Sequence, residues 1–480
     1  MLIKYPELEQ WRCFVPFRFQ VCTSLLLLLY FSAAVAQQSL PRGVLVDSVK
    51  CESSPDHSYA LYLPRNYSPD RKWPVVYIFE PAARGALPVE WFRQGAEKYD
   101  YILAGSNDAR NGPWDPVFKA LNAMSVDVET RFAVDTTRIY TAGFSGGARA
   151  AVTVAVLSDR VVGVIGCGAG QAAGFPVKPG GSFDYVGLVG NRDMNYLEVT
   201  RFSEKLREMK YQSKVIHFQG GHRWPDADLL ESALQWLELQ AMRRGTREGD
   251  DHFTKAIFET MSRTATRLRE QHKLLEAYEL YAAIVRDFHS FYDVSQAEKS
   301  AKQLHENKAV KEALKERNRR AREETKLISR LSRRLRRLNP DDFIGTGTIQ
   351  NEKWWRGEID KLKEKRDAAG TPESRDMAAR VLDWLWRHCS EQSSVYFEKT
   401  GVVRSIMLIQ IWLMVSPDHP YPHYQVARLY AIYGWRELAL SQLEESIKLG
   451  FRNLDRIEND KFWDSLRSQE TFLKIVAPLK

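Results

Sequence analysis

Residues 138–157 read RIYTAGFSGGARAAVTVAVL and contain the most informative local pattern in the chain. A β-rich run at 138–142 leads into Gly-Phe-Ser-Gly-Gly at 143–147, and a helical run at 148–157 follows. A serine on such a tight strand-to-helix turn needs small neighbours if its hydroxyl is to stand exposed above a sheet. The pattern therefore predicts that Ser145 is a nucleophile. The alternative is an ordinary glycine-rich turn.

A serine hydroxyl attacks a substrate only when a base takes its proton and a carboxylate orients that base. With this strand-serine-helix pattern, the three residues are expected in the order Ser, Asp, His. Asp193 lies in a loop after the β-rich run 185–189, and His222 lies in a loop after the run 214–218. We therefore expect Asp193 to be the acid and His222 the base. Three competing residues are less suitable because they lie inside a strand or at the start of a helix: His217, Asp226 and Asp228.

The oxyanion that forms during attack on a carbonyl needs two hydrogen-bond donors. One is normally the backbone N–H after the nucleophile, here that of Gly146, and the other comes from the loop after the third strand. That loop reads Phe-Glu-Pro-Ala-Ala-Arg-Gly at 79–85. Because Pro81 has no N–H, Ala82 is the expected second donor, and Arg84 could add positive charge.

Residues 44–242 alternate β-rich and helical runs, which is typical of an α/β fold with a mostly parallel sheet and flanking helices. The last helical run, at 226–242, is amphipathic and closes this domain. We expect a catalytic domain at 37–242 that contains every candidate catalytic residue and acts by itself. The β-rich runs are 44–49, 59–63, 75–79, 101–104, 138–142, 161–165, 185–189 and 214–218.

Strand patterns stop after residues 243–252, a polar segment with two glycines that we interpret as a linker. Residues 253–480 show helical periodicity, which predicts an all-helical second domain resembling helical repeats. Two segments match part of the tetratricopeptide pattern, in which small residues lie where two helices cross, and ordinary helical hairpins are the alternative. The matching residues are Ala265, Leu268, Ala277 and Tyr281 in the first segment and Ala427, Tyr430, Ala439 and Leu443 in the second.

Residues 1–36 have the features of an export signal. Two arginines precede an apolar run at 25–31, and Ala-Val-Ala at 34–36 provides the small residues required before a cleavage site. The apolar run is shorter than the ~20 residues that span a bilayer, which argues against the alternative of an uncleaved anchor. We therefore expect a periplasmic or extracellular protein that begins at Gln37. Cleavage leaves three cysteines, too few for a disulfide scaffold.

Residues 299–338 form a basic segment with a net charge of +10, whereas the whole chain has +8. Their apolar residues follow the 4,3 spacing of a coiled-coil seam, which the polar residues Arg317 and Glu324 interrupt. Such a helix can bind a protein partner or an anionic surface, and a solvated helix face is the alternative. Nucleic acid is not an expected partner of an exported protein.

The composition of the 480 residues, 44% hydrophobic and 27% charged, is typical of a folded protein of two or three domains. It excludes a disordered, collagen-like or multi-span membrane protein. Chemistry by a serine, a histidine and an aspartate requires neither a metal nor a cofactor, and we expect none.

Three further segments are YLPRNY at 62–67, VDTTRIY at 134–140, shortly before GFSGG, and GGHRWP at 220–225. Together with GFSGG they resemble secreted α/β-hydrolases of the polyhydroxybutyrate depolymerase and feruloyl esterase type, over about residues 44–242. The resemblance implies a lidless serine esterase in which Ser145, Asp193 and His222 match the nucleophile, acid and base. One departure is Glu-Pro at 80–81, where such enzymes usually have His-Gly, and it affects the oxyanion hole.

These patterns predict an exported serine esterase that forms an acyl-enzyme on Ser145 and docks a partner or tethers itself through its helical region. The expected substrate is a small ester or an esterified glycan, whose acyl and alcohol groups the sequence does not define. Two alternatives remain, a serine peptidase and a catalytically silent hydrolase fold that acts as a binding module.

Overall fold

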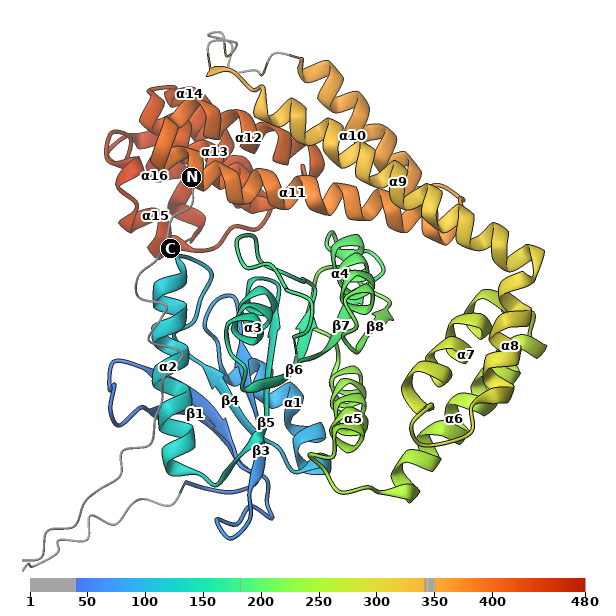
Figure 1. The fold of residues 1–480 in the computed structure, drawn as a ribbon. Helices are drawn as coiled ribbons and strands as arrows, with labels where there is room; N and C mark the ends of the chain where they lie inside the picture. The colour runs from blue at the N-terminus through green and yellow to red at the C-terminus, as the bar shows by residue number, and fades with distance from the viewer. Residues whose placement is uncertain (1–39, 182, 341–342, 344–348, 350, 480) are drawn as a thin grey trace, which may run out of the picture. The chain divides into compact units, whose positions relative to one another are not determined.

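The computed structural model describes residues 40–181, 183–340, 343, 349 and 351–479. The predicted export signal at 1–36 lies outside the described residues. By its packing, the chain forms two units, whose elements are labelled in Figure 1. Among the described residues, the sheet unit comprises those up to Leu188 together with Arg201–Ile216 and Trp224–Gly249. The helical unit comprises Val189–Thr200, His217–Arg223 and the described residues from Asp250 onward.

The sheet has the strand order β1-β2-β4-β3-β5-β6-β7-β8. The pairings of β1 with β2 and of β2 with β4 are antiparallel, and the pairings from β4 through β3, β5 and β6 to β7 are parallel. Each of the eight strands predicted from the sequence is present. The strands are β1 Leu45–Lys50, β2 Ser58–Tyr62, β3 Trp73–Phe79, β4 Ile102–Ser106, β5 Val134–Phe144, β6 Val161–Cys167, β7 Asp184–Gly190 and β8 Ser213–Phe218.

Helices cover both faces of this sheet. They are α1 Ala86–Tyr99, α2 Trp114–Arg131, α3 Gly146–Leu157, α4 Tyr196–Glu208 and α5 Ala227–Arg244. On one face, Val75 and Tyr77 of β3 pack with α2, α3 and α4. On the other face, Tyr140 of β5 and Gly163 of β6 lie against Leu237 of α5, and α1 packs beside α5 (Figure 1).

Burial of both faces explains why the strands are almost continuously apolar, as the sequence WPVVYIF of β3 illustrates. The strand order, the antiparallel β2 and the serine turn after β5 together define the α/β-hydrolase fold. The predicted fold class of the first half is therefore confirmed.

A buried ion-pair network joins α5 to the sheet. The carboxylate of Glu238 contacts the guanidinium groups of Arg138 and Arg247 and the hydroxyl of Tyr101. The side chains of Glu238 and Arg138 are only 1% and 10% exposed. Because three donors surround the buried carboxylate, its lost hydration is replaced, and α5 is held at one point of the sheet.

The second half of the chain is all-helical, as predicted. Its core runs from the end of α9 to α16 and contains mostly leucine, isoleucine, tryptophan and tyrosine side chains. None of the helices that the structure describes combines the length and the apolar composition needed to cross a membrane. The helices are α6 Asp251–Glu270, α7 Leu274–Phe288, α8 Ser295–Glu306, α9 Lys308–Arg336, α10 Glu352–Asp367, α11 Pro372–Thr400, α12 Val402–Val415, α13 Pro420–Tyr433, α14 Arg436–Lys448, α15 Leu454–Asn459 and α16 Glu470–Val476.

The two segments that match part of the tetratricopeptide pattern each form a helical hairpin. Helix α6 packs against α7, and α13 packs against α14. The small residues at the predicted crossing positions are buried in both hairpins: Ala265, Ala277, Ala427 and Ala439. Helical hairpins are therefore present, and their assignment to the tetratricopeptide type stays a prediction.

The basic segment at 299–338 was predicted as one helix, but the structure divides it into α8 and α9. The residue between them, Asn307, has an extended backbone (φ −64°, ψ 132°), and its side chain accepts a hydrogen bond from the N–H of Ala309 (2.8 Å). Asparagine is a preferred helix N-cap because its side chain competes with the helix for the first backbone donors. This competition ends one helix and begins the next.

The two polar positions of the predicted seam each pair with a neighbouring helix. Arg317 pairs with Glu279 of α7, and Glu324 pairs with Arg380 of α11. The polar interruptions therefore occur where α9 changes its neighbours from α7 to α11.

We expect the substitution Glu238→Ala to lower the stability of the protein by about 3–5 kcal/mol, since it leaves the guanidinium of Arg138 buried without its counter-charge. Urea unfolding followed by tryptophan fluorescence measures the change. Glu90→Ala is the matched control because its ion pair with Arg93 is exposed to solvent, and it should cost no more than about 1 kcal/mol. Equal losses in the two variants would contradict the stabilising role of the buried network.

Candidate active site

Ser145 lies on the sharp turn between β5 and α3. Its backbone angles, φ 52° and ψ −117°, fall in a region that residues with a side chain occupy only at a cost in energy. Two glycines make this turn possible. A Cβ on Gly143 would lie 2.3 Å from the backbone of Gly147, and a Cβ on Gly147 would lie 2.1 Å from the carbonyl oxygen of Phe79. This strained turn is the geometry expected of a nucleophilic serine in an α/β-hydrolase fold.

Asp193 and His222 form a buried hydrogen-bonded pair. Nδ1 of His222 lies 2.9 Å from Oδ2 and 3.0 Å from Oδ1 of Asp193. The side chains are 1% exposed for His222 and 0% for Asp193. A second donor, the backbone N–H of Asn195, binds Oδ1 of Asp193 at 2.8 Å. A histidine that binds a carboxylate through Nδ1 can act as a base through Nε2.

The three predicted catalytic residues follow three different strands, β5, β7 and β8. The structure brings Asp193 and His222 together within the helical unit, whereas Ser145 belongs to the sheet unit. The catalytic roles of all three stay predictions. Among the competing residues, His217 lies within β8 as expected, with its ring centre 4.9 Å from that of Tyr196.

The cysteine thiols are less suited than Ser145 to act as a nucleophile. The cysteines at 51, 167 and 389 are free and buried. Burial, and then the nearby carboxylates of Asp127 and Asp108, raise the pKa of Cys51 to about 11, so its thiol stays protonated. Burial also raises the pKa of Cys167 and of Cys389. The described residues contain no group of three or more histidines, cysteines and carboxylates that could hold a metal ion.

The role of Ala82 as an oxyanion donor stays a prediction. In this structure the N–H of Ala82 donates to the carboxylate of Glu80 (2.7 Å). The N–H and the guanidinium of Arg84 bind the same carboxylate. The physical reason is the burial of Glu80, which is 2% exposed and takes the nearest donors in place of water.

The same contacts explain the Glu-Pro sequence at 80–81. Burial alone raises the pKa of Glu80, but its hydrogen bonds to the side chain of Arg84 and to the N–H groups of Ala82 and Arg84 outweigh burial and lower the pKa below its ordinary value. Glu80 is therefore ionised at neutral pH and holds the loop after β3 in one conformation. At the Glu-Pro sequence, the carboxylate of Glu80 thus organises the turn.

Asn111 is a candidate oxyanion donor that the sequence analysis missed. A Cβ on Gly146 would lie 1.7 Å from Oδ1 and 2.9 Å from Nδ2 of Asn111, so the carboxamide lies directly against the Gly146 backbone. The loop after β4 holds it there, because the N–H of Asn111 donates to the carbonyl of Pro81 (2.8 Å) and Arg110 pairs with Ala82 in a β-bridge. A side-chain amide at this point can donate to an oxyanion beside the N–H of Gly146.

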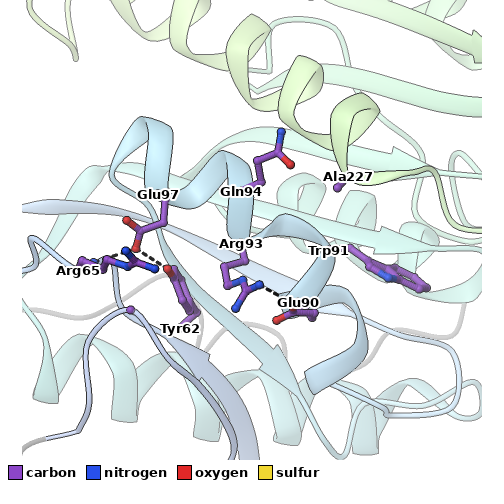
Figure 2. Close-up of a pocket in the computed structure, with 9 residues that line it drawn as sticks. Tyr62, Arg65, Glu90, Trp91, Arg93, Gln94, Glu97 and Ala227 are labelled. Carbon is purple, nitrogen blue, oxygen red and sulfur yellow. Dashed lines mark hydrogen bonds and ion pairs between the residues drawn. The ribbon is translucent and has the colours of Figure 1, made fainter.

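A pocket of about 400 Å³ lies in the sheet unit beside α1, and none of the predicted catalytic residues lines it (Figure 2). Several of its polar groups are paired with one another. Glu97 accepts hydrogen bonds from the hydroxyl of Tyr62 and the N–H of Arg65, and Glu90 pairs with Arg93 (Figure 2). Because these groups satisfy one another, we assign the chemistry to the serine turn rather than to this pocket.

No protein-family model and no curated protein matches the sequence. The S-formylglutathione hydrolase of Staphylococcus aureus is 13% identical with a TM-score of 0.35, over 41% of this chain and 98% of that one. An esterase of Pyrobaculum calidifontis is 11% identical with a TM-score of 0.35, over 42% and 87% of the two chains. The esterase LipW of Mycobacterium marinum is 15% identical with a TM-score of 0.32, over 40% and 81%. Because these sequence identities and TM-scores are low, we assign the fold from the strand order described above and not from these similarities.

We expect Asn111→Ala to lower kcat for ester hydrolysis by a factor on the order of 10²–10³ and to leave KM nearly unchanged, because one of two donors to the oxyanion is lost. Steady-state kinetics with a nitrophenyl ester measures both constants. Asn66→Ala, which removes an exposed amide bound to Asp100, is the control. If kcat of the Asn111 variant stayed near that of the native protein, the second donor would have to lie elsewhere.

Proposed function

We propose that this protein is a serine hydrolase that cleaves carboxylic esters through an acyl-enzyme on Ser145. The observation that carries the proposal is the buried pair of Asp193 and His222, together with the strained serine turn and the chain order Ser, Asp, His. A carboxylate and an imidazole that are withdrawn from solvent and bound through Nδ1 are the arrangement that makes Nε2 a base.

In the proposed reaction, Nε2 of His222 takes the proton of Ser145 as Oγ bonds to the carbonyl carbon of the ester. The carbonyl oxygen becomes an oxyanion and accepts hydrogen bonds from the N–H of Gly146 and the carboxamide of Asn111. The imidazolium then gives its proton to the leaving alcohol, and water attacks the acyl-enzyme by the same route. Asp193 orients the imidazole and stabilises the imidazolium.

Esters are preferred over peptides in this proposal because an alkoxide leaves more readily than an amine, which must be protonated first. A serine peptidase and a silent hydrolase fold remain the alternatives. The silent fold is disfavoured because a binding module has no use for a buried acid–base pair or for a strained serine.

A half-buried aromatic cluster favours an ester with an apolar or aromatic group. The ring of Trp114 lies 5.6 Å from that of Phe118 and 5.0 Å from that of Phe175. Trp114 begins α2 three residues after the candidate donor Asn111, and Phe175 binds Gln171 through its carbonyl oxygen. Flat aromatic rings provide contact area for an apolar acyl or alcohol group, and this part of the proposal assigns that role to the cluster.

Covalent labelling tests the proposal directly. A fluorophosphonate probe, in which Oγ of an activated serine displaces fluoride, should label the native protein and not Ser145→Ala. Ser145→Ala and His222→Ala should each lower kcat by a factor on the order of 10⁴ or more, and the double variant should be scarcely worse than either, because the residues act as a unit.

Asn122→Ala, a substitution of an exposed residue on α2, serves as the control for protein quality. A native protein that neither reacts with the probe nor hydrolyses nitrophenyl, acetylated-sugar or feruloylated-sugar esters would favour the silent fold. Labelling of Ser145→Ala at the native rate would remove Ser145 from the nucleophile role.

Export and docking are also part of the proposal. The residue pattern at 1–36 supports export to the periplasm or the extracellular space, and the net charge of +10 at 299–338 supports a protein partner or an anionic surface for the helical region. Several of these cations are already paired with glutamates of the same or neighbouring helices, which keeps a solvated face as the alternative: Arg319, Arg320 and Arg330.

For the docking part, the chain without residues 1–36 should bind anionic lipid vesicles at low salt and dissociate as ionic strength rises. Replacing the four arginines at the end of the basic segment with glutamine should weaken binding and leave ester turnover unchanged; they are Arg333, Arg334, Arg336 and Arg337. Vesicle sedimentation measures the binding, and binding that ignores both salt and the substitutions would contradict electrostatic docking.

A further inference from the structure

The loop that carries Asp193 is organised by the residue two positions earlier, Asn191. The N–H of Asn191 donates to the carbonyl of Phe218 (2.8 Å), and its Oδ1 accepts a hydrogen bond from the N–H of Gly220 (2.9 Å). Phe218 and Gly220 lie in the segment that leads to His222. Asn191 therefore links the chain that carries the acid to the chain that carries the base.

Helix α11 binds the two remaining polar groups of Asn191. Nδ2 of Asn191 donates to Oδ2 of Asp376 (2.5 Å), and Nη1 of Arg380 donates to the carbonyl oxygen of Asn191 (2.6 Å). The guanidinium of Arg380 also lies over the ring of Tyr196, at 4.6 Å from its centre. The N–H of Tyr196 in turn donates to the carbonyl of Asp193 (2.9 Å), so α11 contacts the loop on both sides of the acid.

Arg380 is itself held in a fixed position by Glu324 of α9. Nε and Nη2 of Arg380 donate to the two carboxylate oxygens of Glu324 at 2.9 and 2.6 Å, and the two side chains are 9% and 1% exposed. A buried two-point pair of this kind fixes the plane of the guanidinium, which leaves Nη1 directed at Asn191.

A third residue of α11, Asp383, lies on the same helix face as Asp376 and Arg380. Asp376, Arg380 and Asp383 are spaced by four and three residues, so they project from one side of the helix. The carboxylate of Asp383 lies near the backbone of Met194, the residue after Asp193. Its Oδ2 is buried and has no hydrogen-bond partner among the described residues. One face of α11 thus follows the loop from residue 191 to residue 194.

We infer that Arg380 and Asp376 of α11 are positioning residues for the acid and base of the proposed hydrolase, and that they act through Asn191. The inference rests on the proposed function. Neither residue takes part in the chemical steps. Their contacts fix the loop that presents Asp193 to His222, so the helical region contributes to turnover as well as to any docking.

The test removes the contact with Asn191 without leaving a buried charge. The full-length double variant Glu324→Met/Arg380→Met replaces both partners of the buried ion pair with apolar residues of similar length. Proteins often tolerate such an exchange. We expect kcat to fall by a factor on the order of 10–100, because a misplacement of the acid–base pair by about 1 Å is that damaging, while KM changes by less than about threefold. The rate of fluorophosphonate labelling of Ser145 should fall by the same factor as kcat.

The matched control is Glu358→Met/Arg330→Met, which removes an ion pair between α10 and α9. It should leave kcat within about twofold of the native value. Two variants of Asp376, one conservative and one not, add a second measurement. Asp376→Asn keeps an oxygen that accepts from Nδ2 of Asn191 and should retain most activity, whereas Asp376→Leu should lose activity as the Arg380 variant does.

The outcomes separate this inference from the proposed function. If the native protein is not labelled at Ser145, the proposed function fails. If the native protein is labelled, and the folded Glu324→Met/Arg380→Met and Asp376→Leu variants keep the native kcat and labelling rate, only the positioning role of α11 is overturned. Circular dichroism and thermal unfolding establish that each variant is folded. Should the double variant fail to fold, the kcat values of Asp376→Asn and Asp376→Leu decide, and equal activity in these two would overturn the inference.

Discussion

The carboxylate of Asp193 is fully buried, and a buried carboxylate is stable only when hydrogen bonds or a counter-charge replace its lost hydration. Nδ1 of His222 and the N–H of Asn195 supply those bonds. They come from two chain segments that follow different strands, so both segments must close over the same point. Asn191 joins these segments to each other and to α11. The need of the buried Asp193 carboxylate for hydrogen bonds therefore determines the arrangement of the loops after β7 and β8.

Three other buried carboxylates shape the molecule in the same way. Glu238 binds α5 to the sheet, Glu324 fixes Arg380, and Glu80 organises the loop after β3. The last case has a chemical consequence. Because Glu80 takes up the N–H of Ala82, the donor expected there from the sequence is already bound, and the carboxamide of Asn111 lies against the serine turn instead. Burial of a carboxylate thus fixes the partners of the N–H groups in this loop.

Local patterns predicted the eight strands, the serine turn and the loops of Asp193 and His222, because strand alternation and the spacing of glycines act over a few residues. The division of the basic segment was missed although Asn307 is a good helix N-cap, since the apolar spacing continues across it. The asparagine-glycine sequence at 111–112 indicates a turn but not what the turn contacts. The bond from Arg380 to Asn191 joins residues 189 positions apart, and no periodicity in the chain reports such a contact.

The linker at 243–252 predicts a catalytic domain that ends at residue 242. The packing of the chain adds an observation to this prediction. Residues 189–200 and 217–223, which carry Asp193 and His222, belong with the helices of the second half. A loop held only by its two ends keeps much of its conformational entropy, and its order must come from contacts that outweigh this cost. Here those contacts include the buried guanidinium of Arg380 and the hydrogen bond to Asp376, beside the bonds from the segment that leads to His222. The contacts of Arg380 and Asp376 come from residues beyond the linker and would be absent from a fragment that ends at residue 242, whose independent activity stays a prediction.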